Sequence, residues 1–124
     1  MEPTSPAHGQ LVLVVEDEAL LRFQAMDTLE AAGYEVLEAP NADAALELLQ
    51  NCAVGVLFTD IQMPGPMNGL ELARLVHERW PDVRLVLTSG RVRPTAADMP
   101  DDSAFLSKPY ASSSLLKTME KAAS

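Results

Sequence analysis

Three carboxylates and one ammonium group stand at or just after the ends of short apolar segments in this sequence. They belong to Glu16, Asp17, Asp60 and Lys108. If these segments end at one edge of a sheet, the carboxylates lie close together, repel one another and raise each other's pKa. A hard cation relieves that repulsion, and oxygen-only ligands with room for water suit Mg2+ better than Zn2+. Neither His nor Cys, the usual zinc ligands, occurs in these segments.

A carboxylate held beside a magnesium ion and a lysine is suited to attack phosphorus. The two positive charges neutralise the oxygens of the phosphoryl group during transfer, and the product is an acyl phosphate. Another apolar segment ends in the hydroxyl groups of Thr88 and Ser89, which would meet the carboxylates at the same edge. The residue types therefore indicate phosphoryl transfer to a carboxylate.

The segments that must position these groups alternate between apolar runs and helical patterns. The continuous aliphatic run Leu11–Val15 is typical of a strand buried on both faces of a parallel sheet. We predict strands at residues 11–15, 34–37, 54–59, 83–88 and 104–106, and helices at residues 18–32, 41–49, 70–79 and 112–122. In the first of these helices, the apolar residues near helical spacing are Leu20, Leu21, Met26 and Leu29.

This alternation, strand then helix, predicts an α/β fold with a doubly wound five-stranded parallel sheet, (βα)5, and helices on both faces. In such sheets ligands bind beyond the carboxyl ends of the strands, where the chemical groups lie.

The fourth helix is expected to be short or irregular. Between Ser89 and Lys108 the only helix-compatible stretch is Pro94–Met99, because Pro100 disfavours helical backbone at the residue before it. The surface formed by the stretch between Ser89 and Lys108 should be acidic, through Asp98, Asp101 and Asp102, and mobile before phosphorylation. We therefore expect a monomer or a weak dimer after activation.

Composition limits the class of protein. Of 124 residues 48% are hydrophobic, and 18 acidic residues against 9 basic ones give a net charge of −9, which argues against binding nucleic acid. The only cysteine is Cys52, and neither a signal peptide nor a membrane-spanning run is apparent. We expect a cytoplasmic protein without a membrane partner, with a flexible tail at residues 1–10 and one domain at residues 11–124.

The sequence resembles the receiver domains of bacterial response regulators, of the stand-alone, CheY-like type. The resemblance runs from about Leu11 to the C-terminus and implies a flavodoxin-like fold. It rests on motifs in a fixed order at successive strand ends: Val14-Val15-Glu16-Asp17-Glu18, Thr59-Asp60-Ile61-Gln62-Met63-Pro64, Gly69-Leu70-Glu71-Leu72, Leu87-Thr88-Ser89-Gly90 and Lys108-Pro109-Tyr110.

The resemblance implies a metal site and a phosphoacceptor. Asp60 would accept the phosphoryl group. Asp17 and Asp60 would bind Mg2+ directly, Glu16 through water and Gln62 through its backbone carbonyl. Mn2+ is expected as a substitute for Mg2+.

It also implies a switch. Lys108 would pair with the phosphoryl group, and its bond to Pro109 would be cis. Ser89 matches the hydroxyl that turns toward the phosphoryl group, with Thr88 as the fallback. Phe105 matches the aromatic residue that moves inward with that hydroxyl. Gln62 and Arg91 occupy two variable positions beside the site, from which they could set the lifetime of the phosphorylated state.

The function implied is two-component signal transduction. The chain would take a phosphoryl group from a histidine kinase or a phosphotransfer protein and switch protein–protein contacts, with autocatalytic transfer and autodephosphorylation but no turnover of other substrates. One alternative is a receiver excised from a hybrid kinase or multidomain regulator. Others are a pseudo-receiver that is never phosphorylated and a magnesium-dependent aspartyl phosphohydrolase, which usually needs a second Asp where Gln62 stands.

Overall fold

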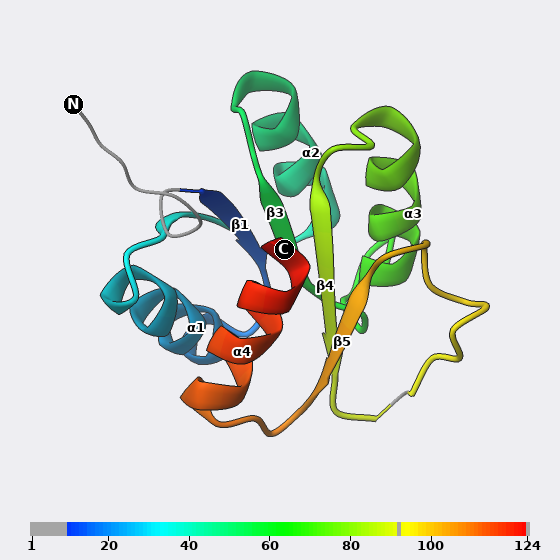
Figure 1. The fold of residues 1–124 in the computed structure, drawn as a ribbon. Helices are drawn as coiled ribbons and strands as arrows, with labels where there is room; N and C mark the ends of the chain where they lie inside the picture. Colours follow the sequence, from blue (N-terminus) through cyan, green and yellow to red (C-terminus); the bar gives the residue numbers. More distant parts are fainter. Residues whose placement is uncertain (1–9, 92, 124) are drawn as a thin grey trace.

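A computed structural model describes residues 10–91 and 93–123. They form a five-stranded parallel sheet in the order β2-β1-β3-β4-β5, which confirms the predicted doubly wound fold (Figure 1). The strands are β1 Leu11–Val15, β2 Glu35–Ala39, β3 Val56–Asp60, β4 Arg84–Ser89 and β5 Ala104–Ser107. The predicted flexible tail lies, except for Gln10, outside the described residues.

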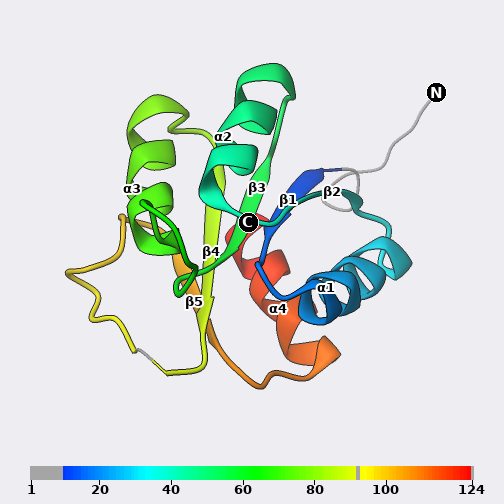
Figure 2. The same cartoon turned by 180° about the vertical axis from the view of Figure 1, so that it is seen from behind.

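Four helices cover the two faces of the sheet: α1 Ala19–Ala31, α2 Ala42–Asn51, α3 Gly69–Arg79 and α4 Ser112–Ala123. Helices α1 and α4 lie on one face, and α2 and α3 lie on the other (Figures 1 and 2). These helices have 10 to 13 residues, and within the described part of the chain no helix is long and apolar enough to cross a membrane.

Side chains alternate along the strands between two hydrophobic clusters, one on each face. In β1, Val12 and Val14 pack in the cluster that includes α1 and α4, whereas Leu13 and Val15 pack in the cluster of α2 and α3. All four are at most 1% exposed, and burying a side chain of this size contributes about 1.5–3 kcal/mol. The central strands are therefore fixed from both faces, and their carboxyl ends are held in place.

Asparagine side chains begin α2 and α3. The side chain of Asn41 accepts a hydrogen bond from the Ala44 amide at 2.8 Å, as expected for a helix N-cap. Asn68 and Glu71 form a reciprocal capping box, each side chain accepting from the other's backbone amide at 2.9 Å. This box starts α3 just after the loop that leaves Asp60.

The connection between β4 and β5 contains no helix among residues 91 and 93–103. The short helix expected at residues 94–99 is replaced by a turn at residues 96–98, because the prolines at each end leave too few residues for stable helical hydrogen bonds. Both the Thr95 amide and its hydroxyl donate to the Asp98 carboxylate, which lowers the pKa of Asp98. Arg74 on α3 donates two hydrogen bonds, at 2.7 and 3.2 Å, to the Asp98 carbonyl. The connection is thus tethered to α3.

Candidate functional site

The carboxyl ends of β1 and β3 bring three carboxylates together. Each of Glu16, Asp17 and Asp60 offers an oxygen within 4.8 Å of the other two. Glu16 and Asp60 are each 5% exposed, whereas Asp17 is open to solvent. These are the three acidic residues that the sequence places at this edge, and their oxygens form a candidate site for a divalent cation.

Lys108, just past β5, reaches this carboxylate group from the other side. Its Nζ donates to Glu16 Oε1 at 2.7 Å and to Asp60 Oδ2 at 3.1 Å. Burial alone would lower the pKa of Lys108, but the hydrogen bonds to both carboxylates outweigh it and raise that pKa. Lys108 therefore carries its positive charge at neutral pH. Its peptide bond to Pro109 is cis, as the resemblance implies.

Burial raises the pKa of Glu16, although the hydrogen bond from Lys108 opposes that change. The nearby charge of Asp60 raises it further. Even beside Lys108, burial and the charge of Asp60 make the ionised form of Glu16 less favourable than it is in water, and a bound cation would offset that cost.

The second oxygen of Asp60 is oriented by the backbone. The Gln62 amide donates to Asp60 Oδ1 at 3.2 Å, while the amide of Gly69 donates to the Ile61 carbonyl at 2.9 Å. In front of Asp60 lies an open cavity of about 290 Å³, lined by Asp17, Glu18, Asp60, Gln62, Gly90, Arg91 and Lys108. Asp60 is thus held rigidly at the edge of a space that admits a phosphoryl-sized group.

The two hydroxyl candidates at the end of β4 point to different places. Thr88 donates to the Leu106 carbonyl of β5 at 2.6 Å and so belongs to the sheet. Ser89 directs its hydroxyl toward the Gln62 side chain, at 3.3 Å. Thr88 is the register partner of Asp60 and Ser89 contacts Gln62, so both hydroxyl candidates lie at the end of β4 next to the strand that carries Asp60.

The predicted switch aromatic, Phe105, is half-buried on β5. Its ring packs against the hydrophobic cluster under α2 and α3, and the Arg93 guanidinium lies 6.0 Å from its centroid. The ring therefore lies between Arg93 of the β4–β5 connection and the core, and the carbonyl of the next residue, Leu106, accepts the hydrogen bond of Thr88.

Sequence inspection missed the contribution of Arg22 on α1. Its Nη1 donates to the Glu16 carbonyl at 2.8 Å, and its Nε pairs with Glu38 Oε1 on β2 at 2.7 Å. Arg22 therefore anchors the backbone of the acidic turn. No sequence pattern shows this, because it depends on β2 lying beside β1.

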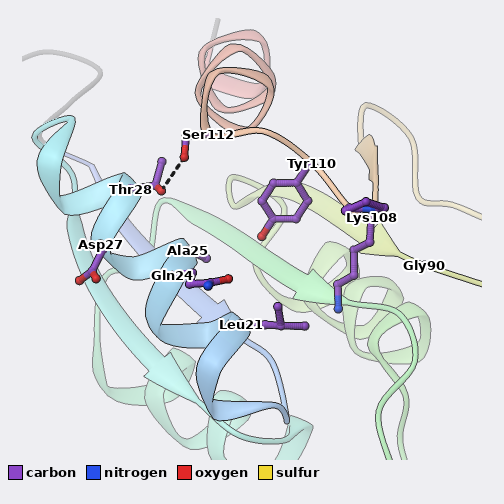
Figure 3. Close-up of a pocket in the computed structure, with 10 residues that line it drawn as sticks. Leu21, Gln24, Ala25, Asp27, Thr28, Gly90, Lys108, Tyr110 and Ser112 are labelled. Carbon is purple, nitrogen blue, oxygen red and sulfur yellow. Dashed lines mark hydrogen bonds between the residues drawn. The ribbon is translucent and has the colours of Figure 1, made fainter.

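A second, larger cavity lies on the other side of Lys108. It has a volume of about 700 Å³ between α1 and the start of α4, and Figure 3 shows the Tyr110 hydroxyl directed into it. Thr28 and Ser112 are hydrogen-bonded at 3.2 Å between the two helices. This cavity links the exposed flank of α1 to the lysine of the site.

Comparison with known proteins agrees with this geometry. The model of the response regulator receiver domain matches residues 12–120. The response regulator receiver protein CpdR of Brucella abortus (strain 2308) is 37% identical over 114 residues, which covers 89% of this chain and 93% of CpdR. Other curated relatives are longer, and the chain spans only 12% to 33% of their length.

Solved structures show the same likeness. A response regulator receiver protein from Sinorhizobium medicae WSM419 superposes with a TM-score of 0.87 at 29% identity, covering 93% of this chain and 94% of that one. The response regulator protein TrrA from Thermotoga maritima, in complex with Mg2+-BeF, superposes with a TM-score of 0.79 at 25% identity, covering 91% and 98%. Sequence, fold and the arrangement of strand ends lead to one conclusion: the chain belongs to the response regulator receiver domain family of two-component signal transduction.

Proposed function

We propose that Asp60 is the phosphoacceptor of this receiver. One observation carries the proposal: Asp60 is the carboxylate that shares both the acidic cluster and the hydrogen bond of Lys108 while facing an open cavity. In the transfer, an oxygen of Asp60 forms a bond to phosphorus. The bond from phosphorus to the donor's nitrogen or oxygen breaks, and its electron pair leaves with the donor.

The residues at this edge fit magnesium. Receiver domains bind Mg2+ at an acidic pocket, and here Glu16, Asp17 and Asp60 supply only oxygen ligands beside a cavity with room for water. We assign Asp17 and Asp60 as direct ligands, Glu16 as a ligand through water and Gln62 as a ligand through its carbonyl. When bound, Mg2+ would neutralise charge on the phosphoryl oxygens. Mn2+ should substitute, since it accepts similar oxygen ligands.

Lys108 and Ser89 complete the site. Lys108 is charged and within hydrogen-bond distance of Asp60, so it supports a phosphoryl group on that residue. We assign Ser89, which contacts Gln62, as the hydroxyl that turns toward the phosphoryl group, with Thr88 as the fallback, and Phe105 as the half-buried ring expected to follow it. Receiver domains are regulatory phosphoacceptors, and Gln62 stands where an aspartyl phosphohydrolase usually has its second Asp. We therefore propose a protein that turns over no other substrate.

Phosphorylation by a small donor tests this function. The purified chain is incubated with acetyl phosphate, with and without Mg2+, and its intact mass is measured. We expect one added phosphoryl group, only with Mg2+, and its loss in hydroxylamine as for an acyl phosphate. A chain that gains no phosphoryl group would contradict the proposal and support the pseudo-receiver alternative.

Replacing Asp17 with alanine should weaken Mg2+ binding by about tenfold or more, the usual effect of damaging a metal site. Asp17 is exposed and packs against nothing in the core, so the fold should persist. Calorimetric titration with MgCl2 measures the change. Asp43→Ala, which removes an exposed acidic residue from α2, is the matched control and should bind Mg2+ as the wild type does. An unchanged affinity in Asp17→Ala would remove this residue from the site.

We further propose that the protein phosphodonor docks on α1. Receiver domains take phosphoryl groups from histidine kinases or phosphotransfer proteins. Among the described residues, the large hydrophobic side chains exposed to solvent are Leu20, 69% exposed, and Phe23, 49% exposed, both on α1. Leu20 is three residues after Asp17, and the same helix borders the cavity that ends at Lys108 (Figure 3). An apolar surface beside a phosphorylation site suits an apolar helix of a donor.

The double variant Leu20→Ala/Phe23→Ala should separate donor recognition from chemistry. We expect phosphorylation by acetyl phosphate to stay unchanged. Transfer from a histidine kinase that phosphorylates the wild type should slow by roughly tenfold, the loss expected when two side chains that become partly buried in an interface are truncated. Transfer rates are followed with radiolabelled kinase. Equal slowing with both donors would instead mean that the substitutions disturb the site itself.

We propose that residues 11–124 act as one receiver unit in the cytoplasm, as a monomer or weak dimer. The net charge of −9 supports a partner other than nucleic acid.

A further inference from the structure

Arg22 on α1 ties the acidic turn to the edge strand β2, and the proposed phosphoryl transfer does not use this residue. Its Nη1 donates to the Glu16 carbonyl at 2.8 Å, and its Nε donates to Glu38 Oε1 at 2.7 Å. We propose that Arg22 is a positioning residue for the metal site: it fixes the peptide that carries Asp17, and Glu38 holds it in the orientation that does so. This inference rests on the proposed function, because it takes Asp17 as a ligand of Mg2+.

The carbonyl that accepts from Arg22 belongs to the peptide bond between Glu16 and Asp17. A peptide unit is planar, so a hydrogen bond that fixes its carbonyl also fixes the direction in which Asp17 leaves it. Asp17 is exposed, and within the described part of the chain its carboxylate makes no hydrogen bond or ion pair. The position of this carboxylate therefore depends on its backbone, which Arg22 holds.

The strand β2 holds both backbone groups of Glu16. The Glu16 amide donates to the Ala39 carbonyl at 3.1 Å, and the Glu16 carbonyl is linked through Arg22 to Glu38, the residue before Ala39. Glu38 is directed to the α1 side of the sheet, because its register partner Val14 packs in the cluster of α1 and α4. The edge strand thus supplies the anchor, and Arg22 connects it to the acidic turn.

A guanidinium group suits this task. It is planar and presents its donors in a fixed fork, so a single group can bond a carbonyl and a carboxylate at the same time. The Arg22 side chain is only 13% exposed, so little water competes for these hydrogen bonds. Its positive charge alone would repel Mg2+, so the charge and the positioning role act on metal affinity in opposite directions. A substitution at this residue can therefore tell the two effects apart.

Titration with MgCl2, followed by NMR of the backbone amides at the site, tests the inference. Arg22→Met removes the charge and both donors, and we expect it to weaken Mg2+ binding by roughly three- to tenfold, below the loss for a partner that bonds a metal ligand directly. Arg22→Lys keeps the charge but not the fork, so it should also weaken binding, by roughly two- to fivefold. Arg84→Met is the control, because it makes the same charge change at the start of β4, on the opposite edge of the sheet.

Glu38→Met provides a second test that leaves Arg22 in place and removes its anchor. The Glu38 side chain is 44% exposed, so this variant should fold even if Arg22→Met does not. We expect it to weaken Mg2+ binding by roughly two- to fivefold, whereas Glu35→Met, at the start of the same strand, should leave binding unchanged. When Asp17 is replaced by alanine, Arg22→Met and Glu38→Met should each change the affinity by less than about twofold, because the ligand through which they act is gone.

The measurements separate this inference from the proposed function. Mg2+ binding that is unchanged or tighter in Arg22→Met, with a lower free energy of unfolding in urea, would mean that Arg22 only stabilises the fold. An equal loss of affinity with and without Asp17 would mean that Arg22 and Glu38 act through their charges. Either result overturns the inference and leaves the proposed function standing. If the wild type does not bind Mg2+, the proposed function fails and this inference fails with it.

Discussion

Replacing Asp60 with asparagine should abolish phosphorylation by acetyl phosphate. The amide has nearly the shape of the carboxylate but is a far weaker nucleophile, so no acyl phosphate should form. The substitution also removes one of the two carboxylates that accept a hydrogen bond from Lys108. The hydrogen bond from Lys108 to Glu16 remains, so the charged lysine keeps a partner. We therefore expect a folded protein whose intact mass does not change with acetyl phosphate and Mg2+, while the wild type gains one phosphoryl group.

The control for this experiment is Asp43→Asn, an exposed position in the first turn of α2, which should be phosphorylated like the wild type. Far-ultraviolet circular dichroism of both variants checks that loss of reaction is not loss of fold. Phosphorylation of Asp60→Asn at the wild-type rate would place the phosphoacceptor elsewhere.

Replacing Gly69 with alanine should destabilise the protein by about 3 kcal/mol or more, the upper part of the range for overpacking a buried position. A Cβ at this residue would lie 1.8 Å from the Asp60 carbonyl oxygen and 2.9 Å from the Ile61 Cα. Both are backbone atoms, so no side chain can rotate to relieve the clash, and the turn that carries Asp60 must move. Urea denaturation measures the loss of stability, and we also expect weaker Mg2+ binding because Asp60 is displaced.

Gly55→Ala is the matched control, because a Cβ there would meet its nearest neighbours at ordinary contact distances of 3.5 and 3.6 Å. Its free energy of unfolding should stay within about 1 kcal/mol of the wild-type value, because alanine also reduces the conformational entropy of the unfolded chain. If Gly69→Ala proved as stable as Gly55→Ala, the close approach of α3 to Asp60 would be wrong.

The α/β fold could be predicted because it depends on patterns that are local in sequence. The buried strand β1 appears as an unbroken aliphatic run and β3 as an apolar run that ends in Thr59 and Asp60, and helical spacing follows each of them. The boundaries were less well determined. The third strand was predicted at residues 54–59 but runs from Val56 to Asp60, because pairing with β1 and β4, not side-chain type, decides where it begins and ends.

Helical spacing also left open which side of α1 faces the sheet. Leu20 has the same apolar character as Leu29, yet Leu20 is 69% exposed and Leu29 is fully buried. Ala25 and Leu29 pack against the strands, whereas Leu20 lies in the first turn, close to the acidic site. The rotation of a helix about its axis depends on the whole surface beneath it, which no pattern within the helix specifies.

By itself, the sequence determined the order of strands and helices, the residues at the strand ends and therefore the chemical groups, Glu16, Asp17, Asp60 and Lys108, that the fold could bring to one edge. Only the tertiary structure decided that Thr88 bonds to β5 while Ser89 contacts Gln62, that Arg22 anchors the acidic turn, and that no helix lies between β4 and β5 within the described residues. The physical reason is the same in each case. Residues next to each other in a strand point to opposite faces, and contacts between distant segments depend on register and side-chain rotation, which are fixed when the sheet and helices pack together.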